Sequence, residues 1–184
     1  VQAIEDLGFD HLCFPDHVVG GNPATHTING PYTHESFFHE PIAAMGYCAA
    51  LTRRLELVPD VAILPQRQTV LFAKQIAALD VLSNGRVRVG IASGWNQIEF
   101  ECLGAEFHDR GQRIEEQVAL LRALWTQNPV KFFGKWHRVN DAGICPLPVR
   151  RPIPLWFGGW SDPVIRRIAR IGDGWFHYAG LGQG

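Results

Sequence analysis

The sequence lacks several features that mark whole classes of protein. Lys and Arg number 17 against 18 Asp and Glu, a formal net charge of -1, so it has no basic surplus to neutralise the phosphates of nucleic acids or anionic membranes. No stretch approaches the roughly 18 consecutive apolar residues of a membrane-spanning helix, and no run of like charges indicates a tail. We therefore expect a chain that binds neither nucleic acid nor membrane.

Paired cysteines are also missing. The four cysteines lie far apart and form no C-x-x-C motif, which argues against a zinc ribbon and against a redox dithiol. This usage fits a reducing compartment, so we expect a cytoplasmic location. The chain begins at Val1, in a stretch typical of the second half of an amphipathic helix, and any targeting segment before it would be invisible in this sequence.

Three motifs of nucleotide-binding and hydrolytic enzymes do not occur. The sequence contains no G-x-G-x-x-G, no G-x-x-x-x-G-K-[ST] and no G-x-S-x-G. It therefore gives no support for Rossmann or P-loop nucleotide binding, or for a hydrolase with a nucleophile elbow.

What is present is an alternation of strand-like and helix-like segments. With 46% apolar residues among 184, the chain can bury one core, and we expect one domain over 1–184. Alternating strands and helices are typical of a parallel sheet covered by helices. The expected strands are 11–19, 55–64, 87–92, 155–159 and 174–178, with a β-hairpin at 130–139. A whole (β/α)8 TIM barrel takes about 250 residues, so we expect an incomplete barrel holding about strands two to six.

Helix ends can be placed from local signals. We expect one helix over 41–51, one capped by Thr69 and stopped at Asn84, and one that opens at Asp162 and closes at Gly172. Another helix is expected to bury one apolar face, made of Ile114, Val118, Leu121 and Trp125.

Polar residues and glycines gather at the ends of the expected strands. Catalytic groups of a TIM barrel sit at the carboxyl ends of its strands and in the loops that follow. Four strand ends are therefore expected to meet at one mouth, and they carry Asp16, His17, Asp60, Val61, Ser93, Gly94, Trp95, Gly158 and Gly159.

Several phrases in this order and spacing resemble the luciferase-like superfamily over almost the whole chain. They are GFDHLCFPDHV, RLELVPDVAILPQRQTVLFAKQIAALDVLSNGRVRVGIASGWNQIEFECLG, FHDRGQRIEEQVALLRALW, PIPLWFGG and DGWF. They are most similar to the branch that uses the deazaflavin coenzyme F420, whereas other branches use FMN and bacterial luciferase is a flavin monooxygenase. The resemblance implies a (β/α)8 barrel, a redox activity and a homodimer.

His17 is the expected catalytic residue, with Asp16 beside it. Imidazole titrates near neutrality and can hold, give or take a proton, and the resemblance places this Asp-His pair near the reactive ring of the cofactor. The alternative is a histidine at the barrel rim that is satisfied by its neighbour Asp16.

Asp60 and Val61 are expected to lie against the cofactor ring. The resemblance places here a non-prolyl cis peptide, often found in the family. Pro59 and Asp60 stand where small residues are usual, which brings a carboxylate to this position. The alternative is an ordinary strand end.

The other cofactor contacts are expected after the two following strands. Gly94 lets the backbone approach a ligand and Trp95 offers an apolar wall, although Trp95 could equally be a core aromatic. Ala92 and Ser93 replace glycines that are more usual in the family. Gly158 and Gly159 precede a helix whose N–H groups could hold the cofactor phosphate, or they make only a tight turn. The nearby Arg166 and Arg167 are expected to be solvated.

The stretch 20–40 has no periodicity and is rich in Gly, Pro, Asn and His. Loops of this length are usually lids or binding loops, and we expect this one to contribute Tyr32, Phe37 and Phe38 to the substrate pocket. Its three histidines, at 26, 34 and 39, do not have the spacing of a metal site, so we expect no metal.

The sequence therefore favours an oxidoreductase that transfers hydride between F420 and a small organic substrate. An FMN-dependent monooxygenase of the same superfamily is the first alternative. A truncated barrel that is inactive or needs a partner chain is the second, and a phosphate-binding isomerase is a weaker third, because it would leave the Asp-His and Gly-Trp sites without a role.

Overall fold

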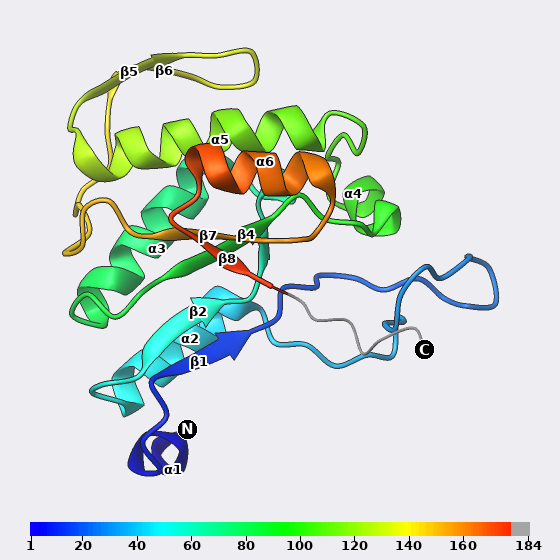
Figure 1. Cartoon of the computed structure of the whole chain (residues 1–184), viewed down its shortest axis with the longest axis horizontal. Coiled ribbons are helices and arrows are strands. Elements are labelled where there is room, and N and C mark those ends of the chain that lie inside the picture. Colours follow the sequence, from blue (N-terminus) through cyan, green and yellow to red (C-terminus); the bar gives the residue numbers. More distant parts are fainter. Residues whose placement is uncertain (178–184) are drawn as a thin grey trace.

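The computed structural model describes residues 1–177, and in it strands alternate with helices as the sequence predicts (Figure 1). In chain order the elements are α1 (Gln2–Asp6), β1 (His11–Phe14), α2 (Pro41–Leu51), β2 (Glu56–Pro59), β3 (Ala62–Ile63), the 3-10 helix η1 (Leu64–Gln66), α3 (Thr69–Leu82), β4 (Val89–Ala92), α4 (Gln97–Cys102), α5 (Arg110–Thr126), β5 (Val130–Phe133), β6 (Arg138–Ala142), β7 (Leu155–Gly158), α6 (Asp162–Ile171) and β8 (Gly174–Phe176).

The strands other than the hairpin pair in parallel, so their carboxyl ends lie at one edge. β1 pairs with β2, and β3, β4, β7 and β8 form a second sheet in that order. A parallel bridge between Leu57 and Val87 joins the two sheets. Within residues 1–177 these strands do not close into a cylinder. This arrangement agrees with the predicted α/β fold and with a barrel that is incomplete in this chain.

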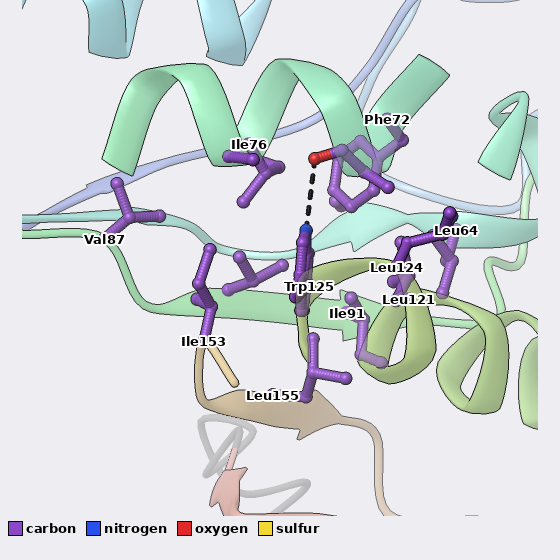
Figure 2. Packing of buried hydrophobic residues seen from close by; sticks show 14 of the residues in the cluster. Leu64, Phe72, Ile76, Val87, Ile91, Leu121, Leu124, Trp125, Ile153 and Leu155 are labelled. Atoms are coloured by element: carbon purple, nitrogen blue, oxygen red, sulfur yellow. Dashed lines mark hydrogen bonds between the residues drawn. The ribbon is translucent and has the colours of Figure 1, made fainter. Parts of the chain in front are cut away.

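The core lies between the sheets and the helices α3 and α5. Trp125 is fully buried, and its Nε1 donates a hydrogen bond to the carbonyl oxygen of Ala73 at 3.1 Å (Figure 2). The other predicted face residues of α5, Ile114, Val118 and Leu121, are also buried. Because an indole N–H in a core needs an acceptor, this bond fixes how α5 packs on α3.

The predicted hairpin is formed by β5 and β6, which pair antiparallel. Figure 1 shows it on the far side of α5 from the sheet. It therefore lies outside the barrel wall, where it cannot contribute to the mouth.

The first predicted strand is shorter and less buried than expected. The segment 11–19 was predicted as a buried strand, but β1 ends at Phe14, and His11 and Cys13 are exposed. Within the described residues β1 has β2 as its only strand neighbour. Pro15 has no N–H to continue the ladder, so the chain leaves the sheet just before the predicted site.

Other boundaries also differ. The predicted strand 55–64 is divided into β2 and β3 at Asp60 and Val61, and Leu64 begins η1. Gln68, not Thr69, caps α3, because its side-chain oxygen accepts the N–H of Leu71 at 2.5 Å. The short helix α4 was not predicted. The last predicted strand, 174–178, ends in the structure at Phe176, and residue 178 lies outside the described residues.

No helix in the part of the chain that the structure describes combines the length and the apolar character that crossing a membrane requires.

Candidate functional site

The predicted segments at the four strand ends contact one another. The backbone N–H of Ile63, in β3, donates to Asp16 Oδ2 at 3.0 Å. The rings of His17 and Trp95 have centroids 5.9 Å apart. Val61 packs on Gly158, where an added Cβ would lie 3.0 Å from Val61 Cγ1. These contacts bring the segments after β1, β2, β4 and β7 to one mouth at the carboxyl edge of the strands, and of their predicted residues only His17 and Trp95 line the two cavities described below.

Asp16 is held in a buried ion pair. Its carboxylate accepts two hydrogen bonds from Arg67, at 3.0 Å from Nε and 2.8 Å from Nη2. Burial opposes the charge of Arg67, but the hydrogen bonds and charges of Asp16 and Glu40 outweigh it and raise the pKa of Arg67. Both carboxylate oxygens of Asp16 are thus engaged away from His17. The interpretation of His17 as a rim histidine satisfied by Asp16 is wrong.

The partner of His17 is Glu99, from α4. His17 Nδ1 lies 3.2 Å from Glu99 Oε1, and the same oxygen accepts the backbone N–H of Val18 at 2.9 Å. Glu99 is only 1% exposed. The imidazole ring also packs against the rings of Tyr32 and Phe38, with centroids 4.6 and 5.0 Å away. Its position is therefore fixed by one carboxylate and three aromatic rings.

The peptide bond between Asp60 and Val61 is cis, as the resemblance implied. Burial raises the pKa of Asp60, against the lowering effect of a hydrogen bond from Cys13. Although the residue as a whole is exposed, neighbouring atoms displace water from around the thiol of Cys13, and this desolvation together with the Asp60 charge raises its pKa to about 11. A carboxylate and a protonated thiol are therefore neighbours at the carboxyl ends of β1 and β2, where Phe14 pairs with Pro59.

Gly94 and Trp95 make a tight turn after β4 and Ser93. Gly94 has a φ of +81°, and a Cβ there would lie 2.5 Å from Ile63 Cγ2, so only glycine fits. Trp95 is 41% exposed, and its ring covers Gly30 of the long loop, where a Cβ would lie 2.3 Å from the indole. The interpretation of Trp95 as a core aromatic is wrong, because its ring lies between His17 and the loop and remains partly exposed.

The glycine pair after β7 leads into α6. Gly159 has a φ of +119°, and its carbonyl oxygen accepts the indole N–H of Trp175 at 2.8 Å. Ser161, the N-cap residue of α6, makes no side-chain cap bond, so the first N–H groups of this helix are not capped by that side chain. Such groups favour anions.

The two arginines of α6 differ from each other. Arg166 is exposed, as predicted, and pairs with Asp162 at 3.5 Å. Arg167 is buried, contrary to the prediction of a solvated residue. It bonds to Glu115 of α5 at 3.1 Å and to the carbonyl oxygen of Gly111 at 2.8 Å. It therefore ties α6 to α5 and is not free to bind phosphate.

Two cavities lie where the long loop crosses the mouth. One, of about 260 Å³, is lined by His17, Tyr32, Phe38 and the loop backbone near Thr33. The other, of about 210 Å³, lies between the loop and α4 and includes Tyr32, Trp95 and Gln97. Phe37 points elsewhere and is 81% exposed. Within residues 1–177 no three His, Cys, Asp or Glu residues gather closely enough to hold a metal.

Sequence reasoning missed Glu99 and Arg67. A weak signal for Glu99 exists, because Asn96-x-x-Glu99 has the spacing of a capping box. In the structure Asn96 is the N-cap residue of α4, but Glu99 turns to Val18 and His17 instead of capping. Arg67 is 51 residues from Asp16, and no local pattern links them.

Comparison with known proteins identifies the family. Residues 1–182 match the family described as luciferase-like monooxygenase. The chain belongs to the luciferase-like monooxygenase family. An uncharacterized protein of Mycobacterium bovis is 32% identical over 186 residues, covering 97% of this chain and 64% of that protein. The FMNH(2)-dependent dimethylsulfone monooxygenase of Pseudomonas putida is 36% identical over 143 residues, covering 75% of this chain and 39% of that protein.

Several solved structures have the same fold as this luciferase-like chain. A monooxygenase from Streptomyces bottropensis has a TM-score of 0.82 at 23% identity, covering 97% of this chain and 51% of that one. An F420-dependent secondary alcohol dehydrogenase has a TM-score of 0.78 at 22% identity, covering 93% and 50%. The chain thus spans less than two thirds of the length of these relatives. Both F420-dependent and FMN-dependent enzymes occur among its relatives.

Proposed function

We propose that the protein carrying this chain is an oxidoreductase that binds coenzyme F420 across the mouth and acts on a small organic substrate. The observation that carries the proposal is the placing of His17. Its ring lies at the carboxyl ends of parallel strands, its Nδ1 is bonded to the buried Glu99, and it lines a cavity beside the partly exposed Trp95. An oriented imidazole in a cavity of this kind is a candidate acid or base.

The residues present fit such a cofactor. Asp60, Val61, Ser93, Gly94 and Trp95 would hold the ring, because they follow the carboxyl ends of β2 and β4 and Trp95 offers an aromatic face. Gly158 and Gly159 would lie near the phosphate, with the N–H groups at the start of α6 as donors. Gly158 would contribute by leaving room for the side chain of Val61, which occupies the space where a Cβ of residue 158 would lie. When bound, F420 would supply a carbon that takes or gives a hydride.

The chain's own groups would manage the proton and exclude water. A substrate that is oxidised loses a hydride from carbon and a proton from oxygen or nitrogen, and we assign that proton to Nε2 of His17. The loop 20–40 covers the site through Tyr32 and Phe38, which pack on the imidazole. Asp16 remains in the proposal as the residue that anchors the start of this loop through Arg67 and β3.

A second candidate is an FMN-dependent monooxygenase. It is favoured by one observation, the 36% identity to an FMNH(2)-dependent monooxygenase over 143 residues. The same mouth would hold the flavin, and molecular oxygen would then be a co-substrate. A homodimer in the cytoplasm is the proposed setting for either reaction.

Titration of the full chain with F420 and separately with FMN, followed by absorbance and fluorescence, tests the proposal. We expect saturable binding of F420 and much weaker binding of FMN. Tighter binding of FMN than of F420 would instead support the FMN-dependent monooxygenase. Binding of neither cofactor would contradict both and would favour an inactive or partner-dependent barrel.

A further inference from the structure

The carboxylate of Glu99, which the sequence analysis did not identify, lies 3.2 Å from Nδ1 of His17. We propose that Glu99 is a positioning residue that holds His17 in the tautomer with the proton on Nδ1, so that Nε2 presents its lone pair to the cavity. The proposal rests on the proposed function, and it identifies the residue that makes Nε2 of His17 a proton acceptor in the proposed active site.

The direction of the hydrogen bond follows from what Glu99 Oε1 already does. This oxygen accepts the backbone N–H of Val18 at 2.9 Å, and a backbone N–H can only donate. A carboxylate oxygen carries no hydrogen and can only accept, so Nδ1 of His17 at 3.2 Å is the donor. In a neutral imidazole only one nitrogen carries a proton, so Nε2 is left as the acceptor.

The surroundings keep this arrangement from relaxing. Glu99 is 1% exposed, and water therefore cannot readily replace it as the partner of Nδ1. The rings of Tyr32, Phe38 and Trp95 pack around the imidazole and restrict its rotation. A ring flip would lose the carboxylate and leave a buried acceptor with one partner fewer, which is unfavourable.

Nε2 is the nitrogen of His17 that Glu99 leaves unengaged. Among the residues that the structure describes, no hydrogen-bond partner is found for His17 Nε2, while the ring lines the 260 Å³ cavity. A carboxylate behind one imidazole nitrogen also stabilises the positive ring that forms when the other nitrogen takes a proton. Glu99 therefore acts on the reaction through His17, without contact to the reacting atoms.

Two substitutions at Glu99 separate the effect of its hydrogen-bond acceptor from the effect of its charge. Glu99→Gln keeps an oxygen that can accept from Val18 and from Nδ1, but it removes the charge. Glu99→Leu removes both the acceptor and the charge. The same substitutions at Glu106 are the matched controls, because this residue is exposed and, within residues 1–177, its side chain accepts one hydrogen bond, from the backbone N–H of His108.

The first readout needs neither cofactor nor substrate. The imidazole ¹⁵N chemical shifts of His17 report which nitrogen carries the proton. We expect Nδ1 to be protonated in the wild type and in Glu99→Gln, and a mixture of tautomers in Glu99→Leu. A wild type protonated on Nε2, or a Glu99→Leu variant with unchanged shifts, would overturn the proposal.

The second readout is turnover with the cofactor that binds. We expect kcat to fall about 10-fold in Glu99→Gln and about 100-fold in Glu99→Leu, with the cofactor Kd within about 2-fold of the wild type in the Gln variant. Unchanged kcat in Glu99→Leu would overturn the proposal. Failure of the proposed function looks different, because the wild type would then bind neither cofactor whatever its tautomer.

Discussion

Two of the histidines that the structure describes are hydrogen-bonded to a glutamate, and of these two only His17 lines a described cavity. At the mouth, His17 Nδ1 bonds to Glu99 at 3.2 Å. On the outer hairpin, His137 Nδ1 bonds to Glu116 of α5 at 2.8 Å, and its Nε2 lies 2.7 Å from Thr69 Oγ1. The side-chain exposures are nearly equal, 13% for His17 and 10% for His137. Exposure therefore does not distinguish the pairs, whereas the engagement of the second nitrogen does.

The outer pair has the order of groups found in a catalytic triad, but its hydroxyl is closed off. Thr69 is 1% exposed and also bonds to Gln117 at 2.9 Å. Glu116 further accepts the backbone N–H groups of residues 135–137. This pair consequently fastens the hairpin to α5 and α3. The hydrogen-bond geometry alone would suggest a catalytic site at both histidines. They differ in whether a substrate could reach the second imidazole nitrogen.

The largest expected effect distinguishes the two histidines directly. His17→Ala should lower kcat about 10²- to 10⁴-fold, the usual contribution of a positioned acid or base, with cofactor binding retained. His137→Ala should leave kcat unchanged within about 2-fold and should lower the melting temperature. Equal loss of kcat in both variants, measured in steady-state assays, would break the comparison.

Asp16 offers the next test, because it is adjacent to His17 in sequence but bonded to Arg67. Asp16→Ala should lower the free energy of unfolding by about 3 kcal/mol, since it leaves the backbone N–H of Ile63 unsatisfied and a largely buried guanidinium with only the more exposed Glu40 as a carboxylate partner. The ¹⁵N shifts of His17 should not change. Urea unfolding gives the first quantity and NMR the second. A changed tautomer of His17 would make Asp16 its true partner.

A smaller loss of stability is expected for the outer pair. Glu116→Gln should lower the free energy of unfolding by about 1–3 kcal/mol, because one amide cannot satisfy all the N–H groups that the carboxylate accepts. Activity should persist. Glu106→Gln is the matched control and should be neutral. If urea unfolding gave the same midpoint for both variants, the hairpin would not depend on this carboxylate.

The pH dependence of stability gives the smallest effect. Burial raises the pKa of Glu116, but hydrogen bonds from His137 and from backbone N–H groups outweigh it and hold the pKa below its usual value. A carboxyl with a lowered pKa stabilises the folded state above its unfolded pKa, and this stabilisation is lost as pH falls through the folded pKa. The difference in unfolding free energy between wild type and Glu116→Gln should therefore be constant near neutral pH and shrink in acid. A difference independent of pH would contradict this origin.

The positions of the four strand ends could be predicted from the sequence, and the contacts among their side chains could not. Apolar runs and their glycines located the segments at His17, Val61, Trp95 and Gly158, because strand ends of a parallel barrel share one edge. Glu99 could not be assigned, since it lies on a short helix in a polar stretch, 82 residues from His17. The alternative interpretation paired His17 with the nearer Asp16, but Asp16 is bonded to Arg67 by two hydrogen bonds.

The shortening of the first strand has a similar cause. The apolar run 11–19 reads as one buried strand, yet Pro15 ends the ladder, and β1 has a partner strand on one side only within the described residues. Whether the side chains of β1 are buried depends on neighbouring strands, which the local sequence pattern does not specify. The hairpin and the helices α3, α5 and α6 were predictable because their glycines, prolines and apolar faces are local signals.

The most direct test of the account is a titration of ¹⁵N-histidine-labelled protein with oxidised F420 and with FMN. The account predicts that the imidazole resonances of His17 shift as one of these cofactors binds, while those of His137 stay in place. Saturable cofactor binding that leaves His17 unmoved, or that moves His137 instead, would contradict it.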